Sequence, residues 1–145
     1  MAFERFTRYI RRVAQGVVER SDLLTRRVAT TALEELVRGT PVDKGVARSN
    51  WRVSLNAPST RTIPAYSPGR NLGIGETANA SAAIEAGRSV IARARSGQTI
   101  HITNSVPYIE RLRNGHSQQQ ARDWVAGALT RARRFVSQAR LVIRG

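Results

Sequence analysis

The chain has 145 residues, which is enough for one domain with a buried core, and 41% of them are hydrophobic. It has no long apolar run and no cysteine, so we expect no membrane span, no secretory signal, no disulfide and no thiolate metal site. The net charge is +14, carried by 23 arginines and a single lysine, Lys44.

The positive charge is spread along the chain. Residues 1–38 carry eight arginines against five acids, residues 39–118 carry ten basic residues against four acids, and residues 119–145 carry six arginines against one acid. This distribution is not that of a disordered basic tail. Arginine binds phosphates and carboxylates, so the surplus could face DNA or acidic partner subunits, or it could simply be solvated. The charge alone does not decide between these alternatives.

Residues 1–38 have the apolar periodicity of one long helix. Apolar residues recur at steps of three and four, at Phe3, Phe6, Ile10, Val13 and Val17 and then at Leu24, Val28, Ala32 and Leu36. Acidic residues precede basic ones at the favourable four-residue spacing, in Glu4–Arg8, Asp22–Arg26 and Glu34–Arg38. Such a long helix could lie over a sheet or project as an arm onto a neighbour, and the narrow stripe of its first half favours a partner surface over a deep core.

The helix is expected to end at Gly39, with the glycine in a left-handed cap and Pro41 preventing continuation. Ser21-Asp22 is a point at which it could be divided into two helices. Strict alternation over 50–55 predicts a half-buried strand. Residues 57–77 are rich in proline and glycine and predict a long extended loop. A loop of this length in a compact domain tends to be functional or disordered, and in a ring-forming protein it would become ordered only against neighbouring subunits.

The second half of the chain predicts a helix, a strand, a short helix and a long helix. The helix at 78–95 has its apolar face at Ala80, Ala83, Ile84, Gly87, Ile91 and Ala94. The strand at 99–103 points Ile100 and Ile102 inward and His101 to the polar side. The short helix starts at Pro107, buries Ile109 and Leu112, and ends at Asn114-Gly115. The last helix, at 119–143, has its stripe at Trp124, Val125, Ala128, Leu129, Ala132, Phe135, Val136, Ala139 and Val142.

This order of elements predicts one domain, residues 1–145, of the α+β class. A small antiparallel sheet would be packed with a long N-terminal helix and a long C-terminal helix.

Patterns typical of catalysis or cofactor binding are missing. His101 fits an exposed or hydrogen-bonded structural residue, and His116 fits a loop residue that caps the short helix. The chain has no HExxH, CxxC or GxSxG motif, and Lys44 does not lie in a phosphate-binding loop. The adjacent carboxylates of Glu34 and Glu35 are expected to face solvent in the middle of a helix. We therefore expect no enzyme activity, no metal and no cofactor.

Two short motifs remain. The first, TPVDKGVARSNWRVSL at 40–55, resembles the segment that follows the long N-terminal helix in the HK97 gp10-like family of tailed-phage neck and tail-completion proteins. The matching residues are Thr40, Pro41, Val42, Asp43, Gly45, Arg48, Asn50 and Trp51. Lys44 departs from the threonine usual in that family. The residues themselves predict an Asx-type turn closed by Asp43 and a positive φ at Gly45.

The second motif, ITNSVPYIERLRNGHS at 102–117, resembles another segment of the same family. The matching residues are Ile102, Thr103, Asn104, Val106, Pro107, Tyr108, Leu112, Gly115, His116 and Ser117. Residues 119–122 depart from the Gln-Ala-Pro that often follows in the family. The two motifs keep the family's order and spacing over nearly the whole chain.

The resemblance implies a structural virion protein of the head–tail junction that is assembled in the host cytoplasm. It implies a homo-oligomeric ring, sixfold or twelvefold, around the DNA channel, in contact with other neck or connector proteins and with tail-terminator or tail-tube proteins. No catalytic residue is carried over. The turn at 40–45 and residues 108–117 would set the geometry, and the long helix and the 57–77 loop would touch neighbours.

Five arginines are candidates for partner or phosphate contacts: Arg5, Arg8, Arg12, Arg131 and Arg134. A strongly basic channel wall would impede the passage of DNA, so most arginines are expected to face adjacent subunits or acidic partner rings. Two alternatives stay open. One is a basic architectural DNA-binding protein without sequence specificity, and the other is a small hydrolase that uses His101 or His116.

Overall fold

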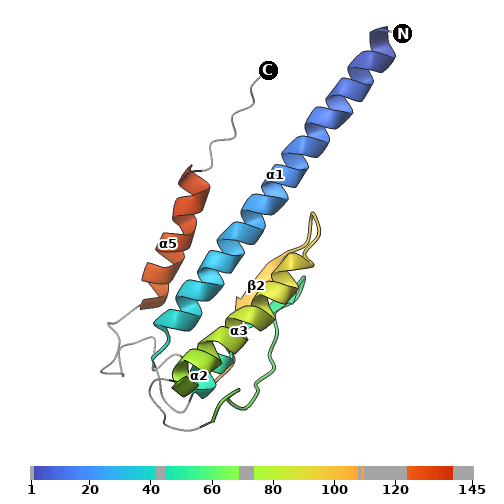
Figure 1. Ribbon diagram of the computed structural model, residues 1–145. Coiled ribbons are helices and arrows are strands. Elements are labelled where there is room, and N and C mark those ends of the chain that lie inside the picture. Colours follow the sequence, from blue (N-terminus) through green and yellow to red (C-terminus); the bar gives the residue numbers. More distant parts are fainter. Residues whose placement is uncertain (1, 42–44, 69–73, 108, 110–123, 139–145) are drawn as a thin grey trace.

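The long N-terminal helix forms the axis of the molecule (Figure 1). In the computed structural model, which describes residues 2–41, 45–68, 74–107, 109 and 124–138, helix α1 runs from Ala2 to Gly39 without a break at Ser21-Asp22. Its 38 residues span about 57 Å at 1.5 Å per residue. One side of its C-terminal half packs against α5, and the other side packs against α3 and the sheet.

The end of α1 corrects one sequence prediction. Gly39 is still helical and does not adopt a left-handed φ. A larger residue would be too close to a neighbouring side chain, because a Cβ built on Gly39 would lie 3.0 Å from Cε3 of Trp124. Close packing of the Trp124 ring, and not backbone conformation, thus accounts for the glycine at this position.

The sheet has two antiparallel strands, β1 (Arg52–Leu55) and β2 (Ile100–Thr103). Val53 pairs with Ile102 and Leu55 with Ile100, so these four side chains lie on the same face of the sheet. Val53, Ile100 and Ile102 pack against the core, as the alternation predicted. His101 pairs with Ser54 on the opposite face and is half-buried.

Helix α3 (Ile74–Ala92) begins four residues before the predicted start, so the expected loop at 57–77 is shorter than its composition suggested. The helix ends at Ala92, three residues before the predicted end, so Ala94 lies just beyond it. All six residues of the predicted apolar face are nevertheless buried: Ala80, Ala83, Ile84, Gly87, Ile91 and Ala94. A single helical turn, α2 (Val46–Ser49), precedes β1 and was not predicted. It includes the residues just before Asn50, so the strand is two residues shorter than expected.

The last described helix, α5 (Trp124–Gln138), packs along α1. Trp124, Ala128 and Ala132 are buried, but Leu129 is 40% exposed, which contradicts its predicted place on the buried stripe. Over residues 124–134 the buried side chains are those of Trp124, Ala128 and Ala132, which form a narrow face of α5. The predicted helix segments 119–123 and 139–143 lie outside the described residues.

These observations confirm an α+β fold with a small antiparallel sheet, a long N-terminal helix and a C-terminal helix. Of the predicted short helix, Pro107 is exposed and Ile109 is packed against the core. The rest of that helix lies outside the described residues.

Candidate assembly surfaces

Residues of the first motif gather at the C-terminal end of α1 in a buried polar cluster. We call it the joint and define it by Thr40, Arg48, Ser49, Asn50, Trp51 and Asn79. Buried polar groups destabilise a fold unless they are hydrogen-bonded, so the partners of these side chains indicate what the joint does.

Thr40 and Arg48 donate hydrogen bonds to backbone carbonyls at the end of α1. The Thr40 hydroxyl donates to the Leu36 carbonyl at 2.6 Å and accepts from Trp51 Nε1 at 2.7 Å. Arg48 Nη2 donates to the carbonyls of Thr40 at 2.7 Å and Arg38 at 3.2 Å. The last carbonyls of a helix have no partner within the helix and carry partial negative charge, so a buried guanidinium is well placed there.

Asn50 holds the loop after β1. Its Nδ2 donates to the Ile63 carbonyl at 2.8 Å and the Val46 carbonyl at 2.7 Å, and its Oδ1 accepts from the Ile63 amide at 2.7 Å. The side-chain amide therefore pairs with Ile63 in both directions, as a neighbouring strand would.

Asn79 holds the same loop four residues further along. Its Oδ1 accepts from the Ser67 amide at 2.6 Å, and its Nδ2 donates to the Ser67 carbonyl at 2.9 Å. The Ser49 hydroxyl donates to Asn79 Oδ1 at 3.0 Å and accepts from the Tyr66 amide at 3.2 Å. The expectation that this loop is ordered only by neighbouring subunits is therefore wrong for residues 63–67, because the chain's own side chains bind their backbone.

Glycine is required at position 45 by the backbone conformation and by the close approach of a neighbouring side chain. Its φ is 74°, in the left-handed region that the motif predicted, and a Cβ there would lie 2.2 Å from Asn79 Nδ2. The second motif meets the first at this point, since Asn104 Nδ2 donates to the Ala47 carbonyl at 2.8 Å. The described residues of the two motifs thus belong to one structural unit.

The tryptophans connect this unit to α5. The rings of Trp51 and Trp124 meet edge to face, with centroids 6.3 Å apart and planes at 84°, a favoured aromatic geometry. The structure thus brings together Thr40, Gly45, Asn50 and Trp51, with Pro41 also buried. Of the other expected assembly residues, Pro107 is exposed, and the rest lie outside the described residues: Val42, Asp43, Tyr108, Leu112, Gly115, His116 and Ser117.

Asn79 and Ser49 belong to the joint but were not singled out from the sequence. A signal for Asn79 was present, because it lies four residues before Ala83 and eight before Gly87 on an otherwise apolar helix face. A polar amide on a buried helix face needs partners, and this rule points to a structural role. Ser49 gave no comparable signal.

The N-terminal part of α1, residues 2–23, extends beyond the rest of the fold, and we call it the arm (Figure 1). Its large apolar side chains are exposed: 79% of Phe3, 60% of Phe6, 57% of Tyr9, 47% of Ile10, 39% of Val13 and 56% of Leu23. We call residues 24–39 the anchored half of α1. Of the two arrangements left open for the first half of the helix, the structure shows the projecting arm, whose exposed apolar stripe is a candidate interaction surface.

A shallow apolar hollow of about 650 Å³ lies where the arm joins the body. It is lined by Leu24, Val28 and Ala32 of α1 and by Ile100 and Ile102 of β2, among others. The apolar stripe of the arm therefore leads directly into an apolar depression beside the sheet.

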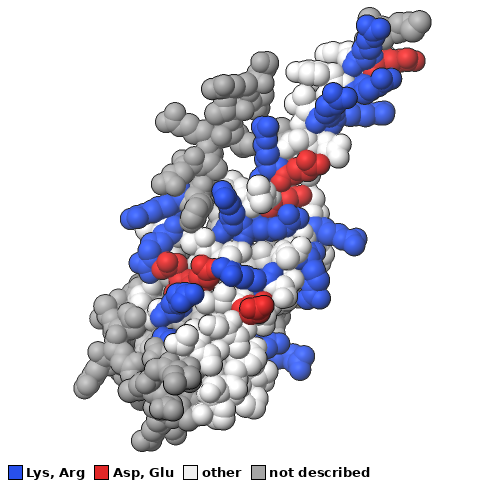
Figure 2. Space-filling model, viewed as in Figure 1, with Lys and Arg blue, Asp and Glu red and all other residues white. Residues whose placement is uncertain are grey.

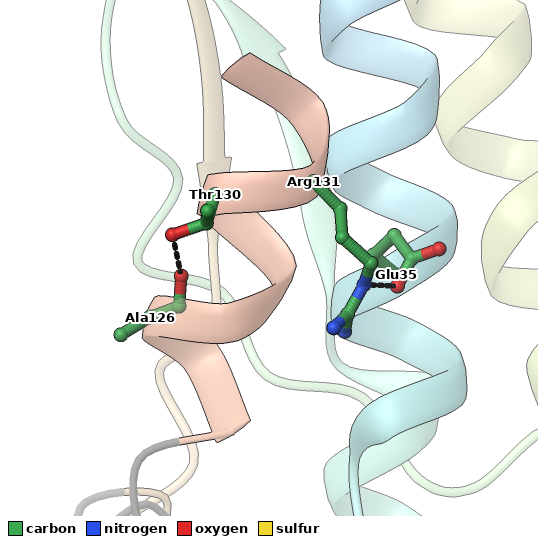
Figure 3. Close-up of polar contacts among 4 residues, drawn as sticks. All are labelled: Glu35, Ala126, Thr130 and Arg131. Atoms are coloured by element: carbon green, nitrogen blue, oxygen red, sulfur yellow. Dashed lines mark hydrogen bonds and ion pairs between the residues drawn. The ribbon is translucent and has the colours of Figure 1, made fainter. Parts of the chain in front are cut away.

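The basic side chains are distributed over the arm and the body, with acidic ones between them (Figure 2). Arg5, Arg8 and Arg12 are exposed on the arm. Arg131 forms an ion pair within the fold, because its Nε donates to Glu35 Oε2 at 2.5 Å (Figure 3). Arg134 is exposed on α5.

The adjacent carboxylates are structural and do not simply face solvent. Glu34 accepts from Arg88 of α3, and Glu35 accepts from Arg131 of α5, with the Glu side chains 29% and 35% exposed. The predicted i,i+4 partner of Glu34, Arg38, is therefore replaced by a residue of another helix. The two neighbouring carboxylates tie α1 to the helices on either side of it.

Among the described residues, no group of histidine, cysteine or carboxylate side chains could hold a metal ion. No described helix has both the length and the apolar character needed to cross a membrane. Comparisons of the chain with protein-family models, with curated proteins and with solved structures give no match.

Proposed function

We propose that this chain is a structural virion protein of the HK97 gp10-like kind, acting at the head–tail junction of a tailed phage. It would form a homo-oligomeric ring, sixfold or twelvefold, that joins the tail to the capsid connector around the DNA channel. Its neighbours would be other neck, connector, tail-terminator or tail-tube proteins. Its role would be mechanical, without catalysis or cofactor.

The observation that carries this proposal is the division of α1 into an anchored half and an arm. The joint fixes the end of the helix with buried hydrogen bonds, while the arm exposes Phe3 and Phe6 to solvent. A projecting helix with an exposed apolar stripe is suited to binding another macromolecule. Four of the residues that carry the family resemblance, Thr40, Arg48, Asn50 and Trp51, belong to the joint.

The direct test is quantitative mass spectrometry of purified particles produced from the genome that encodes this chain. A fixed number of copies per particle, in proportion to other ring proteins of the neck, is the expected result. Abundance in infected cells together with absence from particles would overturn the proposal.

The second candidate function is a basic architectural DNA-binding protein, and the exposed arginines of the arm favour it. A titration of the full chain with duplex DNA at rising salt separates the two. Contact with Z phosphates gives a slope of about −0.9Z in a plot of log affinity against log salt. A virion joining protein whose arginines face protein partners should bind DNA weakly, whereas tight and steeply salt-dependent binding would support the DNA-binding alternative.

A further inference from the structure

The arm carries the sequence pattern of a helix that pairs with another helix. Phe3, Phe6, Ile10 and Val13 follow alternating steps of three and four residues, which is the spacing of the apolar residues between two paired helices. We call this row of side chains the seam. A helix that covers a globular core has a broader apolar face. These four side chains expose between 39% and 79% of their surface, and nothing in the described part of the chain packs over them. Within the described residues, no second helix covers this seam.

The charges of the arm indicate which second helix fits and in which direction. Residues 3–12 carry four arginines against Glu4, a net charge of +3, and residues 13–22 carry Arg20 against Glu19 and Asp22, a net charge of −1. A parallel pair of arms would place the two +3 segments side by side. An antiparallel pair would place each +3 segment beside a −1 segment, so electrostatics favours the antiparallel arrangement.

The side chains of the seam give the register. Continuing the steps of three and four from Val13 leads through position 17 to Arg20. In a parallel pair, two Arg20 side chains would share a layer and repel each other. In the antiparallel register in which facing positions add to 23, Phe3 faces the second copy's Arg20 and Ile10 faces its Val13. Phe3 and arginine can form a cation–π contact, and each layer combines a larger with a smaller or more flexible side chain.

We propose that the arm is a self-pairing surface, on which two copies of this chain bind through antiparallel arms related by a two-fold axis. The pairing goes beyond the head–tail proposal and does not depend on it. A two-fold contact of this kind closes at two copies, whereas a ring needs a head-to-tail contact between different surfaces. The arm contact thus joins two copies of the chain and differs from any contact that would close a ring.

The first test is the mass of the full chain in solution by sedimentation equilibrium. We expect a dimer, twice the 16.0 kDa of one chain, that becomes a monomer when Ile10 is replaced in the variant Ile10→Asp. Gln15→Asp is the matched control, because it adds the same charge on the opposite side of the arm, where Gln15 is exposed. Circular dichroism verifies that both variants are folded. A monomeric wild-type chain, or a dimer that survives Ile10→Asp, would overturn the proposal.

The second test measures direction and uses the absence of cysteine from the chain. Phe3→Cys and Arg20→Cys variants are prepared separately, mixed and oxidised. In the antiparallel pair the two Phe3 positions are separated along the axis by 17 residues, about 26 Å, so Phe3→Cys alone should not cross-link. We expect a disulfide-linked dimer only in the mixture. Cross-linking of Phe3→Cys by itself would show a parallel pair and would contradict the proposed register.

Discussion

The arm and the anchored half of α1 contain similar apolar residues in opposite surroundings. In the anchored half, Leu33 and Val37 have no exposed surface and belong to the core with α3 and α5. In the arm, Phe3 and Leu23 expose more than half of their surface. Removal of apolar area from water is the main source of helix stability in proteins. The anchored half is therefore fixed by the fold, while the apolar surface of the arm stays exposed to solvent.

A pair of leucine substitutions on the same helix gives the largest expected contrast. Leu33→Ala should lower the free energy of unfolding by about 3 kcal/mol, because it removes a fully buried side chain and leaves a cavity between α1 and α3. Leu23→Ala should change it by less than about 0.5 kcal/mol, because Leu23 is exposed. Urea unfolding of both variants measures the difference.

Equal losses of stability in Leu33→Ala and Leu23→Ala would contradict the difference in burial between the two parts of α1. A large loss at Leu23 would mean that its side chain is packed in solution. Because the arm is proposed to pair, both variants should be measured at two protein concentrations, so that dissociation is separated from unfolding.

The next prediction concerns the joint and uses the substitution Asn50→Ala. This substitution removes three hydrogen bonds at once, two to Ile63 and one to Val46, and leaves backbone groups without their partner. We expect a loss of about 2 kcal/mol and faster proteolysis of the loop around Ile63. Asn50→Asp should be at least as harmful, because its carboxylate would face the two carbonyls to which the amide donates. Gln15→Ala, at an exposed site of the arm, serves as the control and should leave both readouts unchanged.

The elements of the fold could be predicted from the sequence where one periodicity acts over a long segment. The length of α1, the buried face of α3 from Ala80 to Ile91, and the inward side of β2 all follow from spacing alone. The class of fold, α+β, follows from their order. These features are local, and the sequence carries them directly.

The joint was only partly predictable, because its geometry is made by residues far apart in the chain. The motif around Thr40 and Asn50 indicated a turn and a strand, but not that Asn50 binds Ile63 or that Asn79 binds Ser67. The single turn of α2 is too short to give a periodic signal. The exposure of Leu129 likewise depends on how closely α5 approaches α1, which no spacing rule contains.

Two glycines of α1 give the smallest but most specific comparison. Gly16 lies in the arm, and a Cβ there would meet nothing within 4 Å, whereas a Cβ on Gly39 would lie 3.0 Å from the Trp124 ring. Alanine is a better helix former than glycine by about 1 kcal/mol, so Gly16→Ala should raise the helical content of the arm. At Gly39 the same gain is opposed by overpacking, which typically costs about 1–3 kcal/mol.

We therefore expect the two substitutions to have opposite signs, although the chemical change is the same. Circular dichroism at 222 nm should show more helix in Gly16→Ala, and the melting temperature should fall in Gly39→Ala as α5 is pushed from α1. Tryptophan fluorescence gives an independent readout, because only Gly39→Ala should disturb the contact between Trp51 and Trp124. Stabilisation by Gly39→Ala would mean that α5 is held loosely. In that case the contact between α5 and the anchored half, and not the joint, would be the adaptable part of the fold.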